Sequence, residues 1–242
     1  FSLVEMLVVL VIIAILAGLT LPHIRGHSES VAIDAATHQL VEDLAFARQK
    51  AISQRSTVVV VFLTDAIYDP GQVSFAIASK QEQDEIQRLR GGVFTHYAIY
   101  GLRRVGEQPG HRTAGYLTEW KSLPEKTFLP TNNNFRVSLL PMERFPFPFS
   151  TSENEPVLPY IAFDSEGRSI KLAASLSGQG TGFLDAAVSI ARGAVFYARD
   201  NQGAILPGNL ELQEIPPYNG TGNVVRVDLL TGRARRDQTL LR

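Results

Sequence analysis

The sequence of 242 residues contains no cysteine, which excludes disulfide frameworks, thiolate catalysis and cysteine-ligated zinc sites. It also lacks an excess of charge of either sign. The net charge is -1 and charged residues make up 19% of the chain, which argues against a disordered acidic chain and a globally basic nucleic-acid binder. The motifs G-x-S-x-G, H-E-x-x-H and the P-loop are absent as well. We therefore expect no enzyme, no cofactor and no metal site.

What the sequence does have is a long apolar run at its start. From Met6 to Leu21 there is no charged residue, and Thr20 alone is polar. A membrane-spanning helix needs roughly 20 apolar residues, so residues 1–22 are predicted to span a membrane. The chain begins at Phe1 without a basic segment, and no small-x-small cleavage site follows the run. We therefore expect a leader removed upstream of Phe1 rather than a secretory signal peptide.

Glu5 interrupts the apolar character of this segment. A carboxylate at the centre of a bilayer costs about 2.5–3.5 kcal/mol on the mildest scale, so it indicates a function and a charged partner. No lysine, arginine or histidine lies on the first turns. The nearest cation is the α-amino group of Phe1, in the same chain or in a neighbour. A bond to a neighbour would couple burial of Glu5 to assembly; alternatively, Glu5 lies among lipid headgroups.

A helical pattern continues beyond this run. Apolar residues recur at spacings of seven, four, three and four, which places them on one stripe of a helix. The stripe consists of Ile33, Leu40, Leu44, Ala47 and Ala51. We predict one helix over residues 1–53, about 80 Å long at 1.5 Å per residue. Residues 1–22 are apolar all round, and residues 23–53 are amphipathic.

Two residues weaken this helix. Gly18 costs about 1 kcal/mol relative to alanine, and Pro22 removes a backbone hydrogen bond at about 3 kcal/mol. The sequence therefore predicts a kink or a local loss of helix over residues 18–22.

Residues 54–242 are predicted to form a β-rich globular head. Apolar or β-branched runs alternate with turn residues, whereas residues 81–159 hold inserted loops and a charged run at 81–90 that we interpret as a solvated connection. The predicted strands cover residues 57–63, 73–79, 92–100, 160–163, 168–172, 186–191, 194–198 and 224–229. The predicted fold class is α+β, with a long N-terminal helix packed on an antiparallel β-rich head, shaped like a ladle.

The segment FSLVEMLVVLVIIAILA at Phe1 to Ala17 resembles the N-terminal signature of type IV pilins and type II secretion pseudopilins. This resemblance implies cleavage by a prepilin peptidase before Phe1, N-methylation of Phe1, and an assembly role for Glu5, which in that family pairs with the N-terminal amine of an adjacent subunit. It also implies that residues around Gly18 and Pro22 unwind in the filament.

Three segments of the head resemble the H-type minor pseudopilins of type II secretion: LVEDLAFARQKAISQRSTVVVVF, YIAFDSEGRSI and VVRVDLLTGRAR. The two resemblances imply a structural subunit of a pilus-like or pseudopilus filament. Its expected partners are further copies, other pilins and the assembly machinery. Its expected location is the inner membrane, as a single-pass protein before assembly, and then an extracellular or periplasmic filament.

The C-terminal region is locally basic. Arg226, Arg233, Arg235 and Arg236 are candidate contacts to phosphate groups. The alternative function is therefore a minor subunit at a filament tip that binds DNA or a secreted substrate through this region. A competing interpretation is that these arginines lie on a solvated strand edge, where they prevent aggregation or contact the next subunit.

Overall fold

The computed structural model describes residues 2–103, 114–130, 140–172, 180–201, 203, 205–215 and 223–237, without the side chains of residues 16–30, 180, 181, 183 and 207–209. The elements are α1 (Leu3–Gln54), β1 (Val58–Phe62), the 3-10 helix η1 (Asp65–Tyr68), α2 (Lys80–Arg90), β2 (His96–Gly101), β3 (Gly115–Tyr116), β4 (Lys121–Ser122), β5 (Thr127–Phe128), β6 (Met142–Arg144), β7 (Val157–Phe163), β8 (Ser169–Leu172), β9 (Gly180–Phe183), β10 (Ala186–Arg199), β11 (Ile205–Glu214), β12 (Asn223–Val227) and β13 (Ala234–Asp237).

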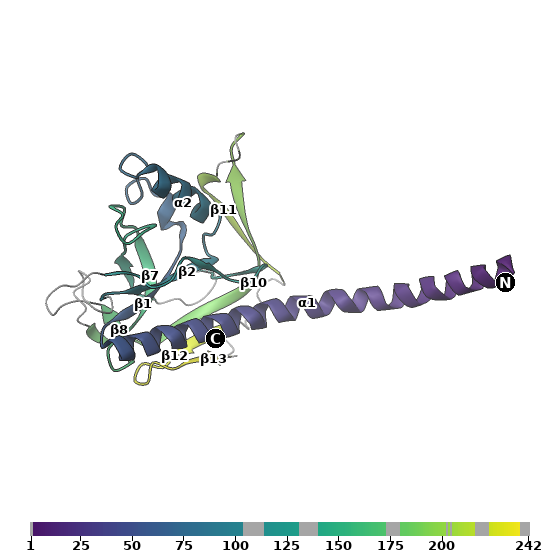
Figure 1. The fold of residues 1–242 in the computed structure, drawn as a ribbon, viewed down its shortest axis with the longest axis horizontal. Coiled ribbons are helices and arrows are strands. Elements are labelled where there is room, and N and C mark those ends of the chain that lie inside the picture. The colour runs from purple at the N-terminus through teal and green to yellow at the C-terminus, as the bar shows by residue number, and fades with distance from the viewer. Residues whose placement is uncertain are drawn as a thin grey trace.

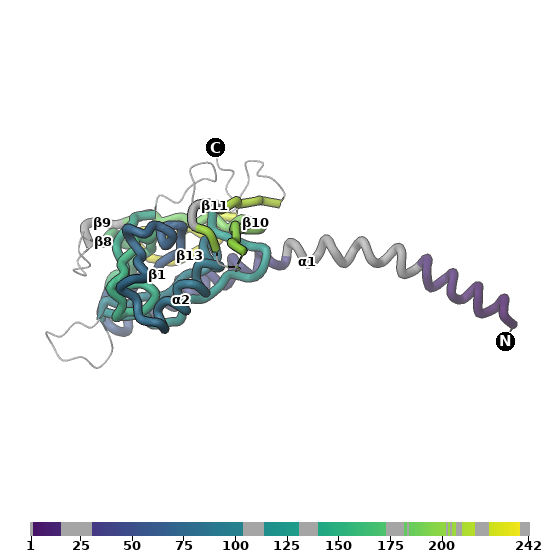
Figure 2. The backbone as a smooth tube through the Cα atoms, turned by 90° about the horizontal axis from the view of Figure 1, so that it is seen from above, coloured from purple at the N-terminus to yellow at the C-terminus, as the bar shows by residue number. Residues whose placement is uncertain are grey.

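α1 is the longest element and extends from one end of the head (Figure 1). Its first residues lie far from the head in a second view as well (Figure 2). The apolar stripe predicted for its second half is confirmed, because Leu40, Leu44, Ala47 and Ala51 are fully buried. α1 ends at Gln54, and the left-handed backbone of the following Arg55 lets its N–H reach the carbonyls of the last turn.

β1 lies at the centre of the larger sheet, hydrogen-bonded to β2 on one side and β7 on the other. The strand order is β3-β2-β1-β7-β8-β9, with β4 on β2 and β6 on β7. Every residue of β1 is buried. Its run of valines therefore suits a strand that is covered on both faces.

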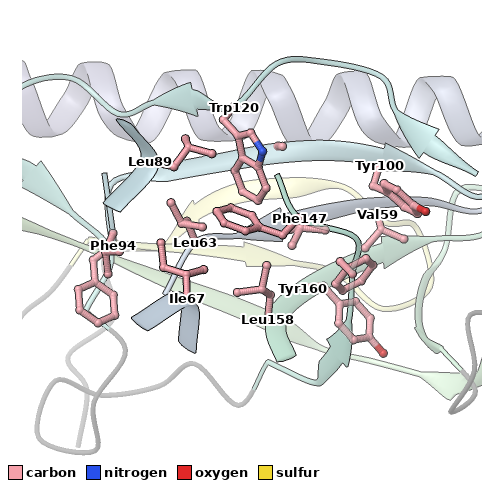
Figure 3. Packing of buried hydrophobic residues seen from close by; sticks show 14 of the residues in the cluster. Val59, Leu63, Ile67, Leu89, Phe94, Tyr100, Trp120, Phe147, Leu158 and Tyr160 are labelled. Carbon is pink, nitrogen blue, oxygen red and sulfur yellow. The ribbon is translucent and has the colours of Figure 1, made fainter. Parts of the chain in front are cut away.

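The two faces of β1 belong to two different cores. Val58 and Val60 point toward α1 and pack with Leu40 and Leu44. Val59 and its neighbours on the opposite face pack with α2, η1 and a group of aromatic rings. Figure 3 shows that second core, where Trp120 and Phe147 meet edge to face. The larger sheet is thus the middle layer between α1 and the inserted segments.

The smaller sheet has the order β11-β10-β12-β13, with β5 on β10. Residues 186–191 and 194–198 were predicted as two strands, but they form the single strand β10. Its first half pairs with β12, and its second half pairs with β11. The positive φ of Gly193 lies at the change of partner, where a side chain would collide with the carbonyl oxygen of Gln213.

The predicted fold class needs correction. The described structure is dominated by antiparallel sheet and has three helical elements where one was expected. The run at 81–90 is not a solvated connection but α2. Ser79 and Glu82 form a reciprocal capping box at its start, and Ile86 and Leu89 anchor it in the core. No strand forms at 73–79, which leads into this cap.

We predict that Leu44→Ala lowers the free energy of unfolding by about 2–5 kcal/mol, because it leaves a cavity between α1 and β1. Phe46→Ala is the matched control, since Phe46 lies two residues away and is 41% exposed. Urea unfolding of the full chain in mild detergent, followed by circular dichroism, measures both. Equal losses in the two variants would contradict the assigned interface.

Candidate assembly interface

The N-terminal part of α1 is exposed on every side. All large apolar side chains from Leu3 to Ile15 are between 48% and 85% exposed. Successive residues of a helix point in different directions, so this exposure covers the whole circumference rather than one stripe. A contiguous apolar surface of this kind marks an interaction site.

The helix has a well-defined beginning. The Ser2 hydroxyl accepts a hydrogen bond from the backbone N–H of Glu5, at 3.3 Å, and therefore caps one of the donors that a helix start leaves unpaired. The negative charge of Glu5 lies in the first turn, where the helix dipole favours it. These two residues explain why the apolar run starts as a regular helix.

Glu5 has no cationic partner among the described residues. The next cationic residue after it that stays charged at neutral pH is Arg25, about 30 Å further along the axis at 1.5 Å per residue. No other cation of α1 can therefore reach this carboxylate. The N-terminal amine of Phe1, the partner expected from the sequence, lies outside the described residues.

The prediction at Gly18 and Pro22 falls within residues 16–30, whose side chains lie outside the description. The backbone there is assigned to the continuous helix α1. The backbone of residues 18–22 is thus helical in this single chain, and the kink or unwinding expected in a filament stays a prediction.

A buried polar cluster fixes the second half of α1 on the larger sheet. Asp43 accepts hydrogen bonds from the Tyr97 hydroxyl and from the Lys121 ammonium, each at 2.6 Å. Gln39 donates to the Tyr97 oxygen at 2.9 Å. Burial, followed by the bond to Asp43, raises the pKa of Tyr97 well above its ordinary value. Because the partners come from β2 and β4, this cluster sets the position of α1 along the sheet.

Polar contacts also hold α1 to the C-terminal turns. The Arg48 guanidinium donates to the backbone carbonyls of Gly167, at 3.1 Å, and Thr231, at 2.7 Å. Gly232 packs so closely on Gly167 that a side chain there would overlap the carbonyl oxygen. Helix and strand turns therefore form one rigid end of the head.

The four predicted phosphate contacts do not form one free basic surface. Arg226 pairs with Asp185 and Asp237 at 3.2 and 3.3 Å, and Arg236 pairs with Asp34 on α1 at 2.5 Å. Arg233 and Arg235 are exposed and make no ion pair within the described part of the chain. Half of the predicted set thus stabilises the fold.

The predicted membrane segment also needs correction. Among the helices of the described residues, none combines the length and the hydropathy required to cross a membrane. The single-pass location predicted for residues 1–22 is therefore withdrawn.

Comparison with known proteins returns no matching family model, no matching curated protein and no matching solved structure.

We predict that Tyr97→Phe lowers the free energy of unfolding at pH 7 by about 1–3 kcal/mol, because Asp43 and Gln39 lose a buried partner. The raised pKa adds a test of sign. Above pH 10 the unfolded tyrosine ionises while the native one stays protonated, so the native state loses stability as pH rises. Above pH 10 the difference in the free energy of unfolding between wild type and Tyr97→Phe should therefore narrow by up to about 1.4 kcal/mol per pH unit.

Chemical denaturation between pH 7 and pH 11.5 measures this difference. If the free energies of unfolding of wild type and Tyr97→Phe change in parallel with pH over the whole range, Tyr97 is not protonated preferentially in the folded state.

Proposed function

We propose that this chain is a structural subunit of a helical filament of the type IV pilus or type II secretion pseudopilus kind, and that copies assemble through the N-terminal part of α1. The observation that carries the proposal is the uncovered apolar surface from Leu3 to Ile15. The resemblance of Phe1 to Ala17 to pilin N-termini supports the same function.

Magnitudes favour association. Fully burying one large apolar side chain contributes about 1.5–3 kcal/mol, and this segment carries such side chains at nearly every position. Association costs about 4–15 kcal/mol in lost translational and rotational freedom. Burial of several of these residues between neighbouring helices offsets that cost, so copies packed through α1 are favoured over a single exposed helix.

Glu5 gives the assembly a register. A carboxylate within a bundle of apolar helices is tolerated only when it has a charged partner. The amine of Phe1 in a neighbouring copy meets that need and fixes how far the neighbour is displaced along the axis. The alternative of a tip subunit that binds DNA has weaker support, because Arg226 and Arg236 already have acidic partners.

The test compares wild type, Glu5→Ala and Glu42→Ala. Glu42 is an exposed glutamate on the part of α1 that packs on the head, which makes it a matched control. We expect electron microscopy and mass spectrometry of sheared preparations from producing cells to find filaments of this chain. Their amount should fall at least about tenfold in Glu5→Ala, since breaking a buried pair costs about 3–5 kcal/mol, and stay unchanged in Glu42→Ala.

Two results would contradict the proposal. Wild-type cells without filaments that contain this chain would remove the structural role. Equal assembly of wild type and Glu5→Ala would remove the role of Glu5.

A further inference from the structure

Two exposed apolar groups lie at opposite ends of the head. In Figure 1 the hairpin of β10 and β11 lies at the end from which α1 projects, whereas the yellow turn between β12 and β13 lies at the other end. Phe196 on the hairpin is 50% exposed, and Leu230 on the turn is 63% exposed. The bond from Arg48 to Thr231 independently places that turn beside the last turns of α1.

The hairpin presents a defined outer face. Phe196 is directly opposite Glu211 in the register, so both side chains lie on the same face of the pair. Ile215 directly follows the end of β11 and is 49% exposed. The inner face is occupied by Val195 and residues that pack on the core. The outer face therefore joins the exposed ring of Phe196 to the carboxylate of Glu211. Arg192 shares this face by alternation, but its guanidinium donates to the backbone carbonyl of Ile215.

The turn at the other end has the complementary character. Leu230 is accompanied there by Arg233, which is exposed and makes no ion pair within the described residues. The carboxylate of the neighbouring Asp228 keeps its charge, but it accepts hydrogen bonds from the backbone N–H and the hydroxyl of Thr231, each at 2.8 Å, and so faces the turn itself. This end thus offers an apolar side chain beside a cation, whereas the hairpin offers apolar side chains beside the carboxylate of Glu211. Within the described part of the chain neither Glu211 nor Arg233 takes part in an ion pair.

We infer that the outer face of the β10–β11 hairpin (Phe196 and Glu211, with Ile215 at its end) docks on the β12–β13 turn (Leu230 and Arg233) of a second copy. This inference rests on the proposed function. When two copies are displaced along the axis of α1, the end of one head from which α1 projects meets the opposite end of the neighbouring head. Such a head-to-tail contact uses two different patches and repeats without closing, and like-charged ends would not permit it.

Cysteine cross-linking tests the contact directly, because the natural chain contains no cysteine. Filaments of the double variant Phe196→Cys with Leu230→Cys should, after mild oxidation, give a ladder of covalent multimers on a non-reducing gel. Phe196→Cys alone and Leu230→Cys alone are the controls and should remain monomeric. Dimers from Phe196→Cys alone would show that two hairpins meet each other, which overturns the inference.

A charge exchange tests the same contact without cross-links. Glu211→Arg and Arg233→Glu should each reduce filament yield by about tenfold, the equivalent of 1.4 kcal/mol, and the double variant should restore it. Thermal melting of each variant checks that the head still folds. If wild type forms filaments but the double cysteine variant gives no ladder and the double charge variant gives no rescue, this contact is overturned and the proposed function stands. Absence of filaments from wild type overturns both.

Discussion

The packing of α1 on β1 is the contact on which the rest of the structure depends. Val58 and Val60 pack against Leu40 and Leu44 of α1. The alternate residues of the same strand pack in the second core, on the opposite face of the sheet. A strand covered on both faces has no solvent side on which a register error is tolerated. The positions of α1, β2 and β7 are therefore set together rather than one after another.

The two halves of α1 differ in surroundings, not in backbone. Residues from Ala36 onward place one stripe on the head, whereas the start of the helix is apolar on all sides and uncovered. Helices in water draw most of their stability from packing, and the second half supplies it here through Asp43 and the apolar stripe. The second half, which is packed on the head, thus stabilises the helix of the first half. The apolar surface of the first half stays uncovered in the single chain.

Much of this arrangement could be predicted from the sequence where the signal is local. The spacing from Leu40 to Ala51 predicted the buried face of α1, and the valine run predicted β1. α2 was missed although its capping box, Ser79 with Glu82, is visible in the sequence; the many charges of the run outweighed Ile86 and Leu89 in our interpretation. The fold class was misjudged mainly because α2 and the short strands from β3 to β6 were taken for loops and connections.

The candidate site was predictable to a smaller extent. Glu5 stood out because a charge within an apolar run is conspicuous without any knowledge of its neighbours. The cluster around Asp43 could not be foreseen, since Tyr97 is 54 and Lys121 is 78 residues away. The arginines were misjudged for the same reason: the partner of Arg236 is Asp34, which is 202 residues distant. Charge counted along the sequence cannot show which charges the fold has already neutralised.

A filament needs direction as well as cohesion, and the proposed assembly assigns these two requirements to different parts of this chain. Apolar burial along α1 is non-directional and by itself would tolerate many axial displacements. A bond from Glu5 to a neighbouring amine would restrict those displacements, but a single carboxylate would leave the rotation of each head undetermined. The proposed contact between the β10–β11 hairpin and the β12–β13 turn would remove that freedom, because its two patches are unlike. In this proposal cohesion arises from the helix, and the orientation of each subunit arises from the head that α1 carries.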